Sequence, residues 1–304
     1  MKILLPVDGS EYSRSAVDFV ATRVSLLGKK PEMELLNVQP EESFWSKLVS
    51  RGKGGEETHD SKSIFRYVEN AFGAHGLGLR KKVLRGKPAE AIAEECRRFG
   101  ADLIIMGSRG LSPYQGLFMG SVSTGVIART STPVLLLRGG EPPAGEKLTV
   151  GIAIDGTDYG AEAARYVADN IDLFGSVSQF VAIYVVTRQV EESFSVAAAC
   201  DGTQLTKEDY ERLSRLALEK AMQPIRKILE EAGITAREVV LRGDPRDEIP
   251  KYAEKHRVDL VVMGSHGYDN FDAAVRGSVA MAVASEGEVP LLLVQKEEPE
   301  VAGH

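Results

Sequence analysis

The sequence predicts an α/β protein of two tandem doubly wound domains, each a five-stranded parallel sheet flanked by helices. First, the pattern Gly, two residues, Gly, nine residues, Gly-Ser occurs twice, beginning at Gly107 and at Gly264. Second, each copy follows an apolar run, 103–106 or 260–263, without the polar alternation of a strand that has one face in water. Third, strand-like and helix-like segments alternate along both halves, which is typical of parallel sheets covered on both sides. A unit repeated with its internal spacing kept indicates two related domains.

The first copy is expected to contain nine elements. Ser10 can cap the first turn of the first helix and Gly28 can end it, with apolar residues at helical spacing between them. Pro88 suits the first turn of the third helix. The short apolar runs between turn residues are typical of strands. The expected strands span 2–7, 33–38, 80–85, 102–107 and 133–138, and the expected helices span 10–27, about 60–74, 88–99 and 121–130.

The second copy repeats this order. Its expected strands span 148–154, 179–186, 237–242, 259–264 and 290–295, and its expected helices span 158–171, 206–232, 245–256 and 278–285. Pro250 falls inside the third of these helices and is expected to kink or shorten it. The segments 41–60 and 187–205 are polar or irregular and are expected to form mobile excursions. Residues 139–145, rich in Gly and Pro, are the expected linker, so the predicted domains span 1–140 and 146–297.

The composition fits this organisation. The chain has 304 residues, of which 43% are hydrophobic and 27% charged, and this length suffices for two domains of roughly 150 residues. The N-terminus reaches Asp8 too soon for a secretory signal, and no apolar stretch approaches the roughly 18 residues that span a bilayer. The cytoplasm is therefore the expected location. Cys96 and Cys200 do not correspond in the repeat, and the five histidines share no metal-ligand spacing, so neither a disulfide nor a metal site is predicted.

The charge is uneven along the chain. Residues 1–140 carry 20 Lys and Arg against 15 Asp and Glu, and residues 141–304 carry 17 against 29. Neither half has the dense basic stripe of a nucleic-acid-binding protein, and the acidic second half would repel phosphate backbones. The difference reflects either solvated faces of different charge or a field that steers anionic ligands to the first domain. Neither a nucleic-acid partner nor a membrane partner is expected.

Each glycine loop stands where a predicted strand ends, which is where open parallel sheets bind ligands. A helix that begins near Gly120 and Ser121 presents unpaired backbone amides and the positive end of its dipole, so phosphate is the expected ligand. Gly107 and Gly110 would let the backbone turn tightly and approach that ligand, and Arg109 would add a charge. The alternative is that these residues are turn glycines followed by a Ser helix cap.

An Asp follows the first strand of each copy, at Asp8 and Asp155. In the usual doubly wound order this strand lies beside the fourth, so the carboxylate could accept hydrogen bonds from a ribose hydroxyl or an adenine amine while the glycine loop holds phosphates. The alternative is an Asp-Gly turn that leads into a helix. Val38 and Val185 lie at the ends of the second strands, where they could contact a base or simply belong to the core.

Taken together, the glycine pattern and the Asp after the first strand resemble the universal stress protein family in its nucleotide-binding, tandem form, over nearly the whole chain. The resemblance implies sheets of order 3-2-1-4-5, ATP with Mg²⁺ as the ligand, and pairing through the fifth strands, as an intramolecular pseudo-dimer and, in addition, as a homodimer. It implies contacts to adenosine and phosphates from Asp8, Val38, Gly107, Arg109, Gly110, Gly120, Ser121 and Val122 in the first domain, and from Asp155, Val185, Gly264, Gly267, Gly277 and Ser278 in the second.

The two copies differ at positions beside the loops. Arg109 corresponds to His266, Lys87 to Asp244, Met119 to Arg276, and Ser123, which could donate its hydroxyl to phosphate, to Ala280. Most of the differences favour anions in the first site, although the arginine in place of Met119 opposes the trend. We therefore predict a second site that is weaker but not empty.

These features predict an ATP-binding regulatory protein of the stress response that acts as a nucleotide-dependent binding module for an unknown protein partner. The chain has no Gly, four residues, Gly-Lys-Ser/Thr pattern, and no general base recurs beside both loops, so no catalytic residue is assigned. Slow ATP hydrolysis or self-phosphorylation is implied only by the resemblance. The alternative is a ligand-independent interaction and oligomerisation module with structural glycine loops. A hydrolase or ligase that uses adenylate is least favoured.

Overall fold

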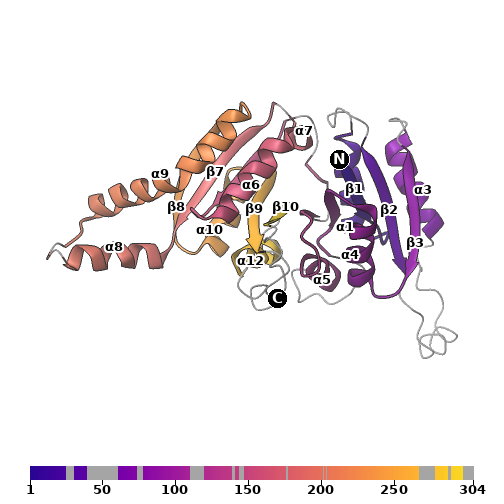
Figure 1. Cartoon of the computed structure of the whole chain (residues 1–304), viewed down its shortest axis with the longest axis horizontal. Helices are drawn as coiled ribbons and strands as arrows, with labels where there is room; N and C mark the ends of the chain where they lie inside the picture. The colour runs from indigo at the N-terminus through magenta and orange to yellow at the C-terminus, as the bar shows by residue number, and fades with distance from the viewer. Residues whose placement is uncertain are drawn as a thin grey trace, which may run out of the picture. The chain divides into compact units, whose positions relative to one another are not determined.

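The computed structural model describes residues 1–24, 31–39, 61–73, 78–109, 120–138, 141–143, 147–175, 177–200, 202, 204–266, 278–286 and 289–296. The chain divides into two compact units, Met1–Ala144 (unit 1) and Gly145–His304 (unit 2). Each unit has a parallel sheet in the middle and helices on both faces, as the ribbon shows (Figure 1). Within the described ranges, no helix combines the length and apolar character needed to cross a bilayer.

Unit 1 has the predicted order of elements. Its strands are β1 (Lys2–Pro6), β2 (Glu32–Gln39), β3 (Leu79–Arg85), β4 (Leu103–Gly107) and β5 (Val134–Leu137), and its helices are α1 (Glu11–Ala21), α3 (Ser61–Phe72), α4 (Pro88–Phe99) and α5 (Ser121–Ile127). The strands are parallel in the order β3-β2-β1-β4-β5. Strands β4 and β5 are buried along their whole length, as strands covered on both faces must be. The predicted order 3-2-1-4-5 is confirmed here.

Unit 2 repeats the arrangement with added helices. Its strands are β6 (Thr149–Ile154), β7 (Gln179–Val186), β8 (Ala236–Arg242), β9 (Leu260–His266) and β10 (Leu291–Lys296), and its helices are α6 (Asp158–Asp169), α7 (Ile171–Phe174), α8 (Arg188–Cys200), α9 (Lys207–Glu231), α10 (Pro245–Lys255) and α12 (Ser278–Glu286). The order β8-β7-β6-β9-β10 is again parallel throughout. The predicted fold class is therefore confirmed in both units.

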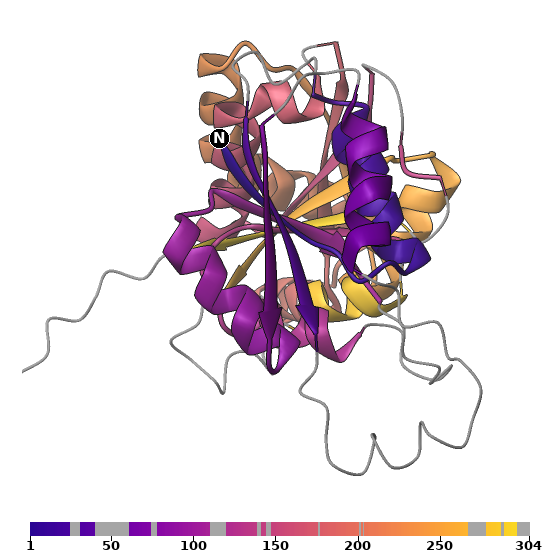
Figure 2. The same ribbon diagram turned by 90° about the vertical axis from the view of Figure 1, so that its right-hand side faces the viewer.

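Helices cover both faces of each sheet, as the view along the sheet of unit 1 makes clear (Figure 2). In unit 1, α1 packs on β4 and β5 beside α3, while α4 packs on β1 and β2 beside α5. In unit 2, α6 packs on β9 and β10 beside α9, while α10 packs on β7 beside α12. Because all strands of a unit run the same way, their carboxyl ends and the helices that follow meet at one edge of the sheet.

Helix α1 ends earlier than the predicted 10–27. It ends at Ala21, after which the Arg23 amide donates to the Val20 carbonyl at 2.9 Å in a tighter, three-residue turn. Gly28, the predicted stop, lies outside the described residues. So do the predicted excursion 41–60 and most of the predicted linker.

The expectation that 187–205 is irregular is wrong, because most of the segment forms α8. Thr187 stands at the start of the helix and its Oγ1 accepts a hydrogen bond from the Val190 amide at 3.4 Å. Phe194 follows Val190 by four residues and so lies on the same side of the helix. The apolar residues of the segment, which also include Val196 and the alanines at 197–199, do not form one clear stripe, so the signal for a helix in the sequence is weak.

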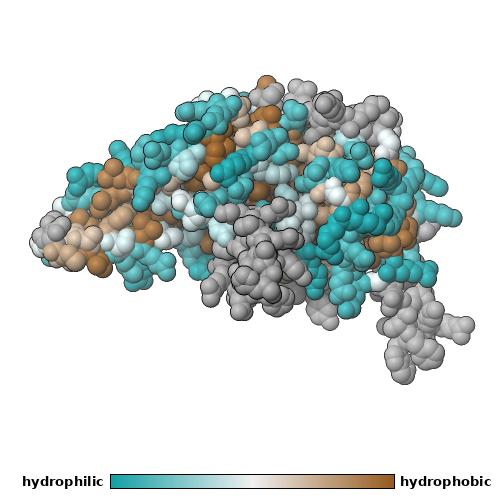
Figure 3. All heavy atoms as spheres, in the orientation of Figure 1, coloured by the Kyte–Doolittle hydropathy of each residue, from teal (hydrophilic) through white to brown (hydrophobic). Residues whose placement is uncertain are grey.

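Helices α8 and α9 form a hairpin in unit 2, joined by a hydrogen bond of 2.6 Å between the hydroxyls of Ser195 and Tyr210. No residue of α8 is buried. Val196 on α8 and Leu216 on α9 are 65% and 58% exposed, and apolar surface is visible over this hairpin (Figure 3). Few packing contacts therefore support α8.

Pro250 does not shorten α10, which runs on to Lys255, so the expected shortening is wrong. Asp244 caps the start of the helix, since its side chain accepts a hydrogen bond from the Arg246 amide at 2.9 Å. Ile249 and other residues of its inner face are buried. Capping and burial thus outweigh the backbone hydrogen bond that a proline cannot donate.

Candidate functional site

An Asp opens the turn between the first strand and the first helix of each unit. Asp8 Oδ1 accepts hydrogen bonds from the Ser10 amide at 3.0 Å and from its hydroxyl at 2.6 Å. Asp155 Oδ1 accepts the corresponding bonds from Thr157 at 2.9 Å and 2.7 Å. The glycines between these partners have positive φ, 83° at Gly9 and 79° at Gly156, where other residues would be strained. The turn uses one carboxylate oxygen, and Oδ2 of each Asp accepts no hydrogen bond from the described residues.

The first glycine of each loop is required by packing against the first helix. A Cβ atom on Gly107 would lie 2.6 Å from Cβ of Tyr12. A Cβ atom on Gly264 would overlap the carbonyl oxygen of Tyr159. Atoms in a close-packed interior cannot approach so closely. Each of these glycines therefore has a structural role that does not depend on a ligand.

Hydrogen bonds join the two ends of the glycine loop at its base in unit 1. The Gly120 amide donates to the Ser108 carbonyl at 2.8 Å. The Ser123 hydroxyl lies 3.0 Å from the Gly107 carbonyl oxygen and 3.2 Å from that of Ser108. Ser123 is only 2% exposed. Its hydroxyl hydrogen, which we expected to serve phosphate, is thus donated to the backbone of the strand end.

A cavity of about 250 Å³ opens at this edge of unit 1, and we call it cavity 1. Seven residues predicted for the first site line it: Asp8, Val38, Gly107, Arg109, Gly120, Ser121 and Val122. They come from the β1–α1 turn, the end of β2, the end of β4 and the start of α5. The Arg109 guanidinium carbon lies 6.0 Å from the centre of the Tyr12 ring. Gly110 lies outside the described residues.

A corresponding cavity of about 190 Å³, cavity 2, lies in unit 2. Asp155, Val185 and Gly264 of the predicted second site line it. Ser278 begins α12, and the two residues that follow it line the cavity. Gly267 and Gly277 lie outside the described residues. The structure therefore brings together three of the predicted residues here.

Sequence reasoning missed the apolar walls of both cavities. Cavity 1 is also lined by Leu36, Ile92 and Met106. The equivalents of the last two, Ile249 and Met263, line cavity 2. The repeat itself held the signal, because an Ile at the inner face of the third helix and a Met before the first loop glycine recur at the same offset.

Two charged positions that distinguish the copies are not among the described lining residues. Lys87 forms an ion pair of 3.1 Å with Glu90 at the start of α4. Asp244 pairs with Arg246, whose side-chain and backbone hydrogen bonds lower the pKa of Asp244 to about 2. Each charge is thus matched within its own helix. These two positions therefore contribute less than we expected to a difference in anion affinity between the two sites.

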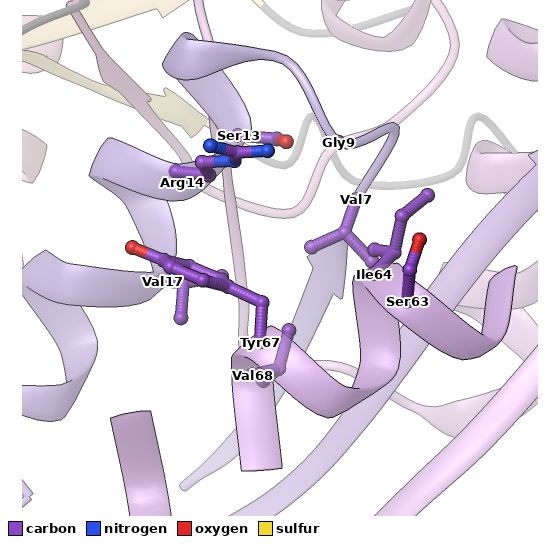
Figure 4. Close-up of a pocket in the computed structure, with 9 residues that line it drawn as sticks. All are labelled: Val7, Gly9, Ser13, Arg14, Val17, Ser63, Ile64, Tyr67 and Val68. Atoms are coloured by element: carbon purple, nitrogen blue, oxygen red, sulfur yellow. The ribbon is translucent and has the colours of Figure 1, made fainter. Parts of the chain in front are cut away.

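A smaller cavity of about 80 Å³ lies between α1 and α3 (Figure 4). Arg14 and Tyr67 face each other across it, with the guanidinium carbon 5.4 Å from the centre of the ring. The Tyr67 hydroxyl donates to the Asp18 carboxylate at 2.8 Å, and burial, followed by this hydrogen bond, raises the pKa of Tyr67 to about 12. No predicted site residue lines this cavity.

Comparisons with known proteins identify the repeated unit. The sequence model of the universal stress protein family matches residues 1–138 and again residues 148–295. A universal stress protein of Mycolicibacterium smegmatis is 24% identical over 300 residues, which cover 96% of each chain. One of Methanocaldococcus jannaschii is 33% identical over 161 residues, covering 51% of this chain and 88% of that protein.

A solved structure has the same fold over nearly the whole chain. A universal stress protein from Archaeoglobus fulgidus matches over 97% of this chain and 98% of its own, with a TM-score of 0.69 and 20% sequence identity. The two family matches account for both units in turn. The chain therefore belongs to the universal stress protein family, as a tandem member with two copies of the family's domain.

Proposed function

We propose that the chain is a cytoplasmic regulatory protein of the stress response that binds ATP with Mg²⁺ in cavity 1 and, more weakly, in cavity 2, and that nucleotide occupancy governs its binding to a protein partner. The observation that carries this proposal is the convergence of residues from four separate segments on cavity 1. The cavity lies outside the carboxyl ends of β1 and β4, where the strand order reverses direction. That is the ligand-binding position of doubly wound sheets.

One part of cavity 1 suits a nucleoside. Leu36, Ile92 and Met106 supply apolar walls against which a base can pack. Asp8 stands at the same edge with Oδ1 engaged by Ser10 and with Oδ2 able to accept a ribose hydroxyl or an adenine amine. The Asp-Gly turn and the ligand contact are thus compatible, because they use different oxygens.

A second group of residues that line cavity 1 suits phosphates. Ser121 and Val122 contribute the first turn of α5, where backbone amides have no partner within the helix. The Gly120 amide, by contrast, already donates to the Ser108 carbonyl. Arg109 contributes a guanidinium group, which pairs well with phosphate oxygens. Among the described lining residues Asp8 is the one carboxylate, and none is His or Lys. We therefore propose binding, and not turnover, as the primary role.

The competing candidate is a ligand-independent interaction module. The packing of Gly107 on Tyr12 and the engagement of Ser123 by backbone carbonyls favour it, since both give the loop residues structural roles. The first test separates the two candidates. The purified protein is denatured and the supernatant is analysed for nucleotide, and the nucleotide-free protein is titrated by calorimetry with ATP, AMP, cAMP and GTP in the presence of Mg²⁺. One solved universal stress protein is a complex with cAMP, so this nucleotide is included.

We expect ATP to bind and to raise the midpoint of thermal unfolding, because a ligand that binds only the folded state stabilises it. Asp8→Asn keeps an oxygen for Ser10 but replaces the anionic Oδ2, and should weaken the tighter site by about tenfold. Asp155→Asn should affect only the weaker site. Asp169→Asn, at an exposed position outside both cavities, serves as the control. No heat with any nucleotide would leave the interaction module as the better account.

A further inference from the structure

Cavities 1 and 2 differ in how the wall formed by the start of the last helix is attached. In unit 1 this wall is tied to the end of β4 by the Ser123 hydroxyl, within 3.2 Å of two carbonyl oxygens. In unit 2 the corresponding residue is Ala280, which lines its cavity and is 5% exposed. Alanine has no hydroxyl, so this link is missing from unit 2.

The missing link is a difference of side chain and not of backbone register. Gly107 pairs with Leu137 on the neighbouring strand, and Gly264 pairs with Val294, the same offset along the repeat. Gly107 and Gly264 also both pack on the first turn of the first helix of their unit, although β9 continues past Gly264 to His266 while β4 ends at Gly107. The carbonyls that Ser123 reaches in unit 1 therefore have counterparts at the same place in unit 2.

The link acts on the part of cavity 1 that we assign to phosphates. Ser123 itself lines cavity 1 together with Gly120 and Val122, and its hydroxyl lies against the carbonyl oxygens at the end of β4. A bond from this position to the Gly107 and Ser108 carbonyls fixes the helix wall relative to the strand wall before any ligand arrives. A site held in its bound geometry loses less conformational entropy on binding, and its affinity rises accordingly.

We propose that Ser123 is a positioning residue that sets the spacing of the two walls in the ligand-free protein, and that Ser123 against Ala280 makes cavity 1 the tighter of the two nucleotide sites. This inference rests on the proposed function, whose ligand it takes as given. We assign the difference in nucleotide affinity mainly to this pair of residues and not to the charges of Lys87 and Asp244. Each of those charges already forms an ion pair at the start of its own helix.

The test exchanges the two residues. Ser123→Ala should weaken ATP binding at cavity 1 by about tenfold, because a wall that is not held in place loses more conformational entropy when the ligand orders it. Ser123→Thr keeps the hydroxyl and should restore most of the affinity. Ala280→Ser should tighten cavity 2 several-fold, a gain that a general loss of stability cannot produce. Calorimetry with ATP and Mg²⁺ is run in an Asp155→Asn background for cavity 1 and in an Asp8→Asn background for cavity 2.

A second measurement needs no nucleotide. Hydrogen exchange of the Gly120 amide, which donates to the Ser108 carbonyl, should be faster in Ser123→Ala than in the wild type and normal in Ser123→Thr. Should Ser123→Ala fail to fold, Ala280→Ser alone decides the matter. Unchanged affinity in both Ser123→Ala and Ala280→Ser, with the wild type binding ATP, would overturn the role of Ser123 and spare the proposed function. A wild type that binds no nucleotide would overturn both the proposed function and the assigned difference in affinity.

Discussion

The carboxyl groups of Glu34 on β2 and Glu95 on α4 face each other in the core of unit 1 and share the guanidinium group of Arg98. Arg98 Nη2 lies 3.6 Å from Glu34, and its Nε donates to Glu95 at 2.9 Å, while Lys82 also pairs with Glu95. Burial, followed by the hydrogen bond with Glu95, raises the pKa of Glu34 from 4.5 to about 7. Burial alone would raise the pKa of Glu95 as well, but hydrogen bonds from Arg98, Glu34 and Lys82 outweigh it and lower that pKa to about 2. In mildly acidic solution the pair therefore carries one proton, on Glu34, and it loses that proton as the pH rises through about 7.

This arrangement predicts that unit 1 loses stability as the pH rises from about 4.5 to about 7. A carboxyl whose pKa is raised by folding stabilises the folded state below its ordinary pKa, and this contribution is lost as the pH rises through about 7. Glu34→Gln stays neutral, so it should be more stable than the wild type at pH 8 by about 1–2 kcal/mol and nearly equal to it at pH 5. Urea unfolding at several pH values measures this, with the exposed Glu94→Gln as control. A wild type whose stability does not fall between about pH 5 and about pH 7 would contradict it.

The packing of Gly107 against Tyr12 predicts that Gly107→Ala destabilises unit 1 in the absence of nucleotide. The added methyl group has no room beside the backbone of α1, and overpacking of this kind costs about 1–3 kcal/mol. Gly78→Ala is the matched control, since nothing lies within 4 Å of its added Cβ. Thermal unfolding of the nucleotide-free variants gives the comparison. Equal stability of the two would mean that the loop glycine serves only a ligand.

Replacement of Pro250 by alanine is expected to stabilise unit 2. The equivalent position in α4 is Ala93, which is buried in an uninterrupted helix. Pro250→Ala gives α10 a backbone donor at a position where proline has none, and should raise the free energy of unfolding of unit 2 by about 1–2 kcal/mol. Chemical denaturation monitored by circular dichroism tests this. A decrease in stability would show that the proline ring contributes more by packing than its missing donor costs.

The α8–α9 hairpin predicts a gradient of local stability along unit 2. Amide hydrogens of α8 should exchange fastest among the helices of this unit, because none of its residues is buried. The end of α9 should be strongly protected, since Ala221, Met222, Ile225 and Leu229 are buried there. Hydrogen exchange followed by mass spectrometry resolves both segments in one experiment. Equal protection of α8 and the end of α9 would require a covering partner for the hairpin.

Most of the fold could be predicted from the sequence, because buried parallel strands leave continuous apolar runs. The run at 103–106 falls inside β4 (Leu103–Gly107), and the same holds for 260–263 and β9 (Leu260–His266). Helix α8 could not be predicted, because a helix without a buried face has no strong apolar periodicity. The pairing of domains and of chains through their fifth strands stays a prediction.

The residues that line the candidate site could be predicted from the sequence, but the hydrogen bonds among them could not. The offset of the repeat located Asp8 and the loop glycines, which line cavity 1 together. It did not reveal that Ser123 faces carbonyls of residues 107 and 108, because that contact depends on how α5 returns to the strand end. Gly264 likewise has to be a glycine because Tyr159 packs against it, and these two residues lie more than 100 positions apart in the sequence.

Every described residue that lines cavity 1 belongs to unit 1, and every one that lines cavity 2 belongs to unit 2. A substitution among the described residues of one pocket therefore leaves the described walls of the other unchanged in sequence. Each copy can thus change without the other, and Ser123 in one copy against Ala280 in the other is a difference of this kind.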